Sequence, residues 1–306
     1  MRTPPVDRDA ISFILPLWAG CDGLAAADQP LRRMAGRLPP RGLRRAWRTR
    51  TRRAWHPHVE HVRRYDQAMA RRSVDPARTW AAQLERRRPG LVADVLDGLA
   101  KLYGRPRWKP RLDPISELVT TILSQNTSDT NAARAFAALR ERYANWAAVE
   151  SAPVRQLASV IKSGGLAAQK APRIKAALKA TRLKSGDYDL SFLKEMEPLT
   201  ARGWLTAIPG IGPKTASIVM LFCFGVPLMP VDTHVERVSK RIGLIPGNAS
   251  LKFAHDAWLH LVPPERMYEA HVALIRHGRG HCDALRPDCG GCPVRQRCRS
   301  VNRRAP

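Results

Sequence analysis

The chain has 306 residues, 44% of them hydrophobic, which is enough for one large core or two ordinary ones and excludes a mini-protein that depends on cysteine staples. It carries 52 Lys and Arg residues against 26 Asp and Glu, and this net charge of +26 favours a polyanionic partner over a merely basic, soluble surface. No apolar run reaches the ~18 residues that a membrane span needs, which excludes a transmembrane protein.

Residues 1–90 form the first predicted segment, an Arg-rich extension. They hold 20 basic and 8 acidic residues, and all 20 basic residues are Arg, whereas 11 of the 32 basic residues in 91–306 are Lys. Because aliphatic positions are few, we expect this extension to bury little and to be poorly ordered or partly helical. Arg interleaved with Trp47 and Trp55 suits phosphate contact and base stacking. A solvated charged helix, or an upstream start codon wrongly included, fits the same residues.

The chain from residue 91 onward is predicted to be all-α, with nine or ten helices joined by short Gly or Pro connections. Apolar residues recur at spacings of three and four from Leu91, and Pro106 closes that first segment. Asp113 then precedes Pro114, an N-cap followed by proline at the first helical position. Alternating strand patterns are nearly absent. Further helical patterns cover 129–143, 153–161, 169–181, 199–207, 213–224, 232–241, 250–261 and 265–277.

A tight turn stands between two of these helices, where residues 205–216 read LTAIPGIGPKTA. Gly210 and Gly212 let the backbone take positive φ or approach a ligand closely. Pro213 marks the first turn of the next helix, whose free N–H groups can hold an anion such as a DNA phosphate. The same pattern also fits an ordinary connector between two helices.

Lys214 and Asp232 are the candidate catalytic pair. A lysine amine is nucleophilic only when it is neutral, and a helix N-terminus in a basic surround favours the neutral form. A carboxylate such as Asp232 can stabilise positive charge that develops on a sugar and can move protons while the amine attacks. Taken alone, Lys214 also fits a solvated phosphate contact, and Asp232 also fits a helix N-cap.

Four cysteines near the C-terminus have a spacing that a compact loop can bring onto one metal centre. All-thiolate ligation suits either an Fe–S cluster or structural zinc. Zinc modules usually pair two short intervals, and only one interval here is short, so we favour an Fe–S cluster. Such tight clustering also favours a reducing compartment over an oxidising one. The residues, in the pattern Cys-x6-Cys-x2-Cys-x5-Cys, are Cys282, Cys289, Cys292 and Cys298.

At these residues the chain resembles the endonuclease III family of helix-hairpin-helix DNA glycosylases. Three blocks carry the resemblance: the hairpin with Lys214, the VDTH sequence at 231–234 with Arg237 behind it, and the cysteine spacing, which is the family's [4Fe–4S] pattern. A fourth block, 113–129, looks like the family's early helix and DNA-wedging segment. Together the blocks span about residues 91–300, roughly two thirds of the chain.

The resemblance implies an all-α fold of two domains. A six-helix domain over 112–226 would carry the helix-hairpin-helix at about 199–224. A discontinuous domain of 91–111 plus 227–306 would hold a [4Fe–4S] cluster on the four cysteines, and the active site would lie in the cleft between the two domains. The resemblance also suggests a monovalent cation on the carbonyl groups of the hairpin.

The reaction implied by the resemblance removes a damaged, oxidised pyrimidine that is flipped out of double-stranded DNA, and then nicks the strand. Lys214 would attack C1′ of the sugar, and the resulting Schiff base would undergo β-elimination, with Asp232 assisting both steps. Abasic sites would be substrates too. We expect a monomer with no membrane partner, acting in the bacterial cytoplasm at the nucleoid. The implied DNA contacts are Gln125, Asn126, Thr127, Gly210, Ile211, Gly212, His234, Arg237 and Arg286.

Several alternatives stay open at this level. Gln125-Asn126 stands where well-known members carry Ala-Gln, which leaves open the residue that fills the gap of the flipped base. A family branch that acts on mismatched adenine has a glutamate where this chain reads Thr121 to Leu123, so a lyase is favoured here. The rivals are a glycosylase of mismatched or methylated pyrimidines in the same fold, a non-catalytic Fe–S DNA-binding protein and a zinc-stabilised module. No separate metal site is expected at the histidines His234, His271, His277 and His281.

Overall fold

The protein is built from helices, which confirms the predicted fold class. The computed structural model describes residues 75–302, so Trp47, Trp55 and most of the predicted Arg-rich extension lie outside the described residues. Within this range the chain forms α-helices and short 3-10 helices, and no strand. None of the helices in this range combines the length and the apolar character needed to cross a membrane.

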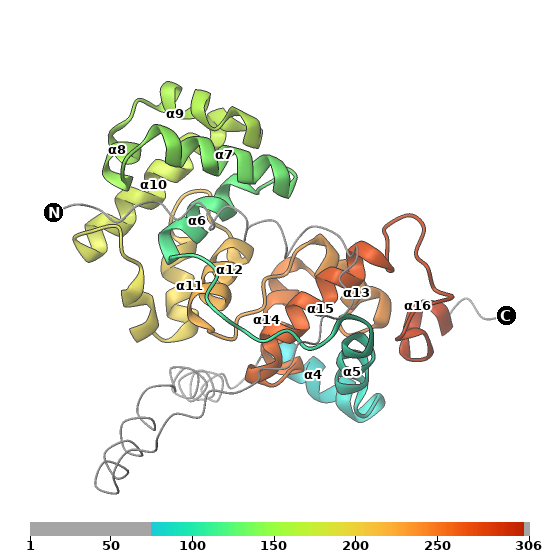
Figure 1. Cartoon of the computed structure of the whole chain (residues 1–306). Coiled ribbons are helices and arrows are strands. Elements are labelled where there is room, and N and C mark those ends of the chain that lie inside the picture. The colour runs from blue at the N-terminus through green and yellow to red at the C-terminus, as the bar shows by residue number, and fades with distance from the viewer. Residues whose placement is uncertain (1–74, 303–306) are drawn as a thin grey trace, which may run out of the picture.

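The helices gather in two groups, and the segment 104–113 crosses from one group to the other (Figure 1). The first group contains α6 (Pro114–Leu123), α7 (Asp129–Arg142), α8 (Trp146–Ser151), α9 (Val154–Val160), α10 (Ala167–Ser185), α11 (Pro198–Thr206) and α12 (Pro213–Phe224). The second contains α4 (Pro76–Arg87), α5 (Leu91–Tyr103), α13 (Thr233–Ile242), α14 (Leu251–Leu261), α15 (Met267–Gly280) and α16 (Arg299–Asn302). Short 3-10 helices cover Lys162–Gly164, Ser191–Glu195, Pro264–Arg266 and Arg295–Arg297.

Capping residues explain where several of the described helices begin. Asp113 accepts a hydrogen bond from the Ser116 backbone N–H at 3.0 Å, as its place before Pro114 predicts. Asn145 caps α8 in the same way, through the Ala148 N–H at 2.9 Å. The sequence patterns did not predict α8, because a helix of six residues is shorter than two turns and shows no periodicity.

Helix α12 lies between two hydrophobic cores. All of its residues from 215 to 224 are buried. Val219 and Met220 pack into the core of the first group, whereas Ile218 and Phe222 pack into the core of the second. A helix that is apolar on all sides must be covered on all sides, and the two cores supply that cover. The N-terminus of α12 is therefore held at the junction of the two groups.

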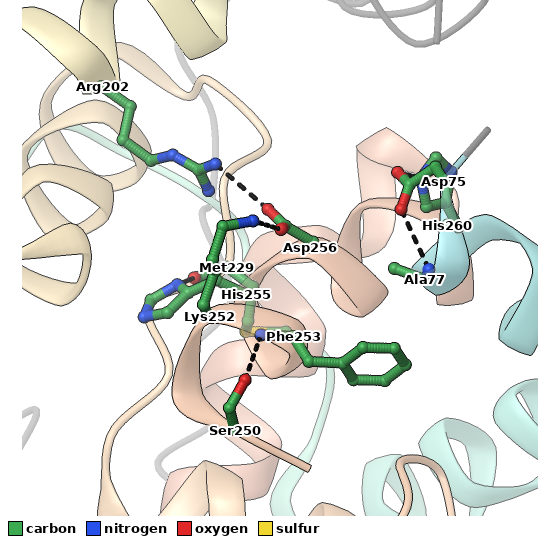
Figure 2. Close-up of polar contacts among 10 residues, drawn as sticks. All are labelled: Asp75, Ala77, Arg202, Met229, Ser250, Lys252, Phe253, His255, Asp256 and His260. Carbon is green, nitrogen blue, oxygen red and sulfur yellow. Dashed lines mark hydrogen bonds and ion pairs between the residues drawn. The ribbon is translucent and has the colours of Figure 1, made fainter. Parts of the chain in front are cut away.

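Helix α4 lies within the segment predicted as an Arg-rich, partly helical extension, and it packs against the second core. Its Ala77 and Leu84 are buried in the second core, and its Trp80 indole N–H donates to the Leu244 carbonyl at 2.8 Å. The Asp75 carboxylate, which caps α4, also lies 3.0 Å from Nε2 of His260 on α14 (Figure 2). Two buried aliphatic residues and a few polar contacts thus suffice to pack this helix. The packing of the described chain against the second core therefore begins at residue 75.

Candidate active site between the two cores

Lys214 lies in the first turn of α12, directly after the hairpin. Gly212 is the N-cap and Pro213 is the first helical residue, so Lys214 stands where backbone N–H groups have no partner inside the helix. Its side chain is exposed, although residues 215–224 of the same helix are buried. The structure thus fixes an exposed amine at the positively polarised end of a rigid helix.

The hairpin turn explains its glycines individually. Gly210 has φ +86°, and a Cβ there would lie 2.4 Å from Cδ of Arg173, so only glycine fits on both counts. A Cβ on Gly212 would meet no atom of the described chain within 4 Å, which leaves that backbone open to a ligand. The Ile211 side chain is buried, and its N–H donates to the Ile208 carbonyl at 3.1 Å. The side chain therefore packs the turn, and a DNA contact at Ile211 stays a prediction.

Asp232 is the N-cap of α13. Its Oδ1 accepts a hydrogen bond from the Val235 N–H at 2.7 Å, and its side chain is only 8% exposed. The carboxylate nevertheless lines the same cavity as Lys214. The N-cap and the catalytic interpretation of this residue are therefore compatible, since capping occupies Oδ1 alone.

The cavity that holds Lys214 and Asp232 has a volume of about 530 Å³ and takes its walls from both groups of helices. Ligand sites typically enclose ~300–1,000 Å³. Burial lowers the pKa of the nearby His271 to about 4, while Asp232 raises it and Lys214 lowers it further.

One wall of this cavity carries polar side chains that the sequence motifs did not single out. Arg111 and Thr120 belong to it. The Arg111 Nε donates to Oε2 of Glu117 at 2.9 Å, Nη2 pairs with the other oxygen, and the guanidinium lies 5.2 Å from the centre of the Phe222 ring. Glu117 is fully buried, so this ion pair is a fixed part of the wall. No periodic or spacing signal in the sequence would have revealed it.

In the predicted wedge segment, Gln125 is hydrogen-bonded to other parts of the protein, whereas its neighbour Asn126 is exposed. Gln125 donates from Nε2 to the Gly210 carbonyl at 3.2 Å and accepts a bond from Nη1 of Arg173 at 2.9 Å. Asn126 is exposed, has φ +52° and lines the cavity, as does Thr127. The structure thus ties Gln125 to the hairpin and leaves the Asn126 side chain at the edge of the cavity.

His234 and Arg237 have different positions relative to the cavity. His234 lines it, and burial lowers the pKa of the ring. Arg237 donates to the carbonyls of Gly278 at 2.8 Å and Cys282 at 3.1 Å, and its Nη2 lies 3.1 Å from the His234 Nδ1. These contacts give the half-buried Arg237 a structural role, and its DNA contact stays a prediction.

The cysteine segment folds around a second cavity of about 580 Å³. Arg241 organises it by donating to the Asp283 carbonyl at 2.5 Å, the Ala284 carbonyl at 2.7 Å and the Cys282 Sγ at 3.4 Å. Within residues 75–302, no three His, Cys, Asp or Glu side chains are arranged to share one metal ion. All four predicted ligands nevertheless line this one cavity, namely Cys282, Cys289, Cys292 and Cys298.

Two further residues border the cysteine cavity. His277 is buried, and its Nε2 lies 3.6 Å from Sγ of Cys292, so this histidine belongs to the wall around the thiols. Arg286 is exposed in the segment between Cys282 and Cys289. Of the two predicted basic contacts in this region, Arg286 is therefore exposed, whereas Arg237 is half-buried.

Two ion pairs of the described chain join the two groups of helices. Arg279 on α15 pairs with Asp129 at the start of α7 at 3.1 Å, and both side chains line the Lys214 cavity. Arg202 on α11 pairs with Asp256 on α14 at 3.3 Å, and Lys252 reaches the same carboxylate at 2.8 Å (Figure 2). These contacts fix the two groups relative to one another and so fix the shape of the cavity.

Comparison with known proteins agrees with this arrangement. Residues 119–263 match the HhH-GPD superfamily of base excision DNA repair proteins. Endonuclease III of Bacillus subtilis is 34% identical over 192 residues, which are 63% of this chain and 84% of that protein. Endonuclease III of Rickettsia felis is 32% identical over 217 residues, which are 69% of this chain and 97% of that protein. The chain belongs to the endonuclease III family.

Solved structures place this family member on the same fold. A trapped endonuclease III–DNA covalent intermediate superposes with a TM-score of 0.61 at 30% identity, over 70% of this chain and 96% of that one. A thermostable thymine-DNA glycosylase gives a TM-score of 0.58 at 20% identity, over 72% and 98% of the two chains, and so shares the fold. The protein is therefore a base excision DNA repair enzyme with the helix-hairpin-helix fold.

Proposed function

We propose that this protein is a bifunctional DNA glycosylase and AP lyase that removes oxidised pyrimidines from double-stranded DNA. One observation carries the proposal: the exposed amine of Lys214 and the buried carboxylate of Asp232 line one cavity between the two cores. This chain covers most of the length of its endonuclease III relatives. One similar solved structure is a trapped covalent intermediate of endonuclease III with DNA. An amine nucleophile suits such a complex.

The chemistry starts with the damaged nucleotide turned out of the duplex into the cavity. The neutral Lys214 Nζ attacks C1′ of the sugar, the bond from C1′ to the base breaks, and the base leaves with the electron pair. The attacking nitrogen gives up a proton to the Asp232 carboxylate. The sugar ring opens to a Schiff base. Loss of a proton from C2′ then expels the 3′ phosphate, which nicks the strand, and water releases the lysine from the product.

The DNA contacts in this proposal come from four places. The free N–H groups at the start of α12, next to Gly210 and Gly212, hold a phosphate, and the hairpin carbonyls hold the predicted monovalent cation. Asn126 fills the gap that the flipped base leaves. His234 and Thr127 border the sugar and the phosphates. Exposed Arg286 adds a backbone contact from the cysteine segment.

The cysteine segment suits a [4Fe–4S] cluster. In a cluster each thiolate binds a different iron, so the four sulfurs can be spread around a sizeable cavity, as they are here. A zinc ion would instead draw all four sulfurs to ~2.3 Å from one point. The cluster would cross-link residues 282–298, and so hold Arg286 toward the DNA in the bacterial cytoplasm, at the nucleoid.

Borohydride reduction tests the mechanism directly, because it converts the Schiff base into a stable link between protein and DNA. The wild-type protein should be trapped on a duplex with one oxidised pyrimidine, and Lys214→Ala should neither be trapped nor nick the strand. Asp232→Asn keeps an N-cap residue on α13, so it should fold normally while excision falls by at least ~100-fold. Unchanged trapping by Lys214→Ala contradicts the mechanism. Tight lesion binding with no excision by the wild type favours a non-catalytic binding protein.

A further inference from the structure

The wall of the catalytic cavity on α6 contains one hydroxyl group without a partner. Thr120, Thr121 and Ser124 all line the cavity. The Thr121 hydroxyl donates to Glu117 at 3.4 Å, and the Ser124 hydroxyl donates to the Thr121 carbonyl at 2.9 Å. Thr120 is 6% exposed, and its Oγ1 finds no hydrogen-bond partner among the described residues. Of these three hydroxyl groups, the structure leaves only that of Thr120 unsatisfied.

This arrangement is unusual for a threonine on a helix. A helical threonine commonly satisfies its hydroxyl on the carbonyl four residues earlier, as Thr181 does with Ala177 at 2.9 Å. Thr120 makes no such bond among the described residues. A buried polar group left unpaired is costly, whereas one that borders a ligand cavity recovers a partner when the ligand arrives. Thr120 therefore lines the cavity and carries a buried hydroxyl group that has no hydrogen-bond partner in the described chain.

The neighbours of Thr120 define the chemistry that it meets. Arg111 is neutralised by Glu117, and its two bonds to that carboxylate use Nε and Nη2 but not Nη1. Ile218 and Phe222 supply apolar surface in the same cavity. A wall with hydrogen-bonding groups, no net charge and adjacent apolar surface suits a neutral base that carries carbonyl or hydroxyl oxygens. It does not suit an anion.

We infer that Thr120 is a specificity-determining residue whose hydroxyl hydrogen-bonds the flipped base, with Arg111 beside it as a second donor. This inference rests on the proposed function and names the part of the substrate that the catalytic pair does not touch. Lys214 and Asp232 act on the sugar, which every substrate shares. Thr120 acts on the base, which an abasic site lacks. The loss of its hydroxyl therefore slows base release and spares abasic-site cleavage.

The test compares Thr120→Val, which keeps the shape of the side chain, with wild type under single-turnover conditions. The duplexes contain thymine glycol, dihydrouracil or an abasic site. Excision of both bases should fall roughly 10-fold in Thr120→Val, while abasic-site cleavage stays within about twofold of wild type. Thr120→Ser, which restores a hydroxyl, should recover most of the excision rate.

Ser217→Ala is the matched control. The Ser217 hydroxyl is also fully buried without a partner in the described chain, but Ser217 is not among the described residues that line the cavity, so this variant should excise normally. Excision by Thr120→Val at the wild-type rate overturns the inference, and so does an equal loss on the abasic duplex. Failure of the proposed function would look different, because the wild-type protein itself would then neither cleave the abasic duplex nor be trapped by borohydride.

Discussion

The side-chain amide of Gln125 donates to the carbonyl of Gly210 at 3.2 Å, across 85 residues of sequence. This bond joins the turn after α6 to the hairpin before α12. Arg173 on α10 closes the arrangement by donating to the same Gln125 side chain at 2.9 Å. Gln125, one of the residues expected to touch DNA, thus aligns the wedge turn with the hairpin, while its neighbour Asn126, also expected to touch DNA, stays exposed at the cavity.

Replacing Gln125 should therefore weaken catalysis without removing the chemistry. We expect Gln125→Ala to lower single-turnover excision roughly 3- to 10-fold, because two lost hydrogen bonds of ~1 kcal/mol each loosen the hairpin against the wedge turn. Borohydride trapping should persist. Gln169→Ala changes an exposed glutamine at the start of α10 and should have no effect. Complete loss of trapping in Gln125→Ala would argue for a direct catalytic role.

The two hairpin glycines should respond differently to alanine. Gly210→Ala forces a positive φ and a 2.4 Å contact with Arg173, so it should lower the free energy of unfolding by about 1–3 kcal/mol. Gly212→Ala meets no described atom within 4 Å and should leave the melting temperature unchanged, yet it should weaken DNA binding where a phosphate approaches the backbone. Thermal unfolding and equilibrium binding measure the two effects. Equal destabilisation by both variants would contradict this assignment.

The variants Arg286→Ala and Arg237→Ala should differ in the salt dependence of their DNA binding. Arg286 is exposed, so Arg286→Ala should reduce the slope of log K against log salt by about 1. Arg237 is committed to internal carbonyls, so Arg237→Ala should keep the slope and lose stability instead. Titrations at several salt concentrations, with urea unfolding in parallel, give both quantities. A reduced slope for Arg237→Ala would support its predicted DNA contact.

Arg241 should matter for the cofactor. Its bonds to three successive carbonyls, from Cys282 to Ala284, hold the first ligand in place. Arg241→Gln should therefore purify with less of the broad absorbance near ~400 nm that an Fe–S cluster gives, and should lose it faster in the presence of a chelator. Arg155→Gln, an exposed change on α9, is the control and should keep the absorbance of the wild type. Equal cluster content in the two variants would contradict the role of Arg241.

Buried histidines should make the protein less stable in mild acid. Burial lowers the pKa of both His255 and His271 to about 4, against about 6.5 when unfolded, so the unfolded chain binds more protons between these values. Their contribution is intact above pH 6.5 and falls as the pH drops, by roughly 2 kcal/mol for each histidine at pH 5. Urea unfolding at pH 7.5 and 5 should show this fall.

His271→Phe offers the sharper measurement. The Pro230 carbonyl lies near the His271 ring and raises its pKa slightly, against the larger effect of burial. Neither ring nitrogen makes a hydrogen bond to the described chain, so His271→Phe breaks none. The ring packs edge-on against Phe222, with the two centres 5.5 Å apart, which a phenylalanine can reproduce. The variant should keep its stability at pH 7.5 and lose less of it at pH 5. An identical fall in wild type and variant would exclude His271 as the cause.

Local features of the sequence predicted the fold class and most helices. The N-cap at Asp113, the glycines and proline before Lys214 and the four-cysteine spacing act over a few residues, so they can be read along the chain. The packing of α4 could not be read in this way. Its two buried aliphatic residues give a weak pattern, and its anchors, Leu244 and His260, lie more than 160 residues away.

The sequence by itself determined the chemical groups: an amine at a helix start, a carboxylate at the next helix start and four thiols at fixed spacing. Only the tertiary structure decided which of the other groups are free to act. The side chains of Gln125 and Arg237 donate hydrogen bonds to carbonyls that are distant in sequence, whereas the Thr120 hydroxyl has no partner in the described chain. A hydrogen-bond partner that is remote in sequence leaves no local pattern, so these roles are set by the packing of the two cores.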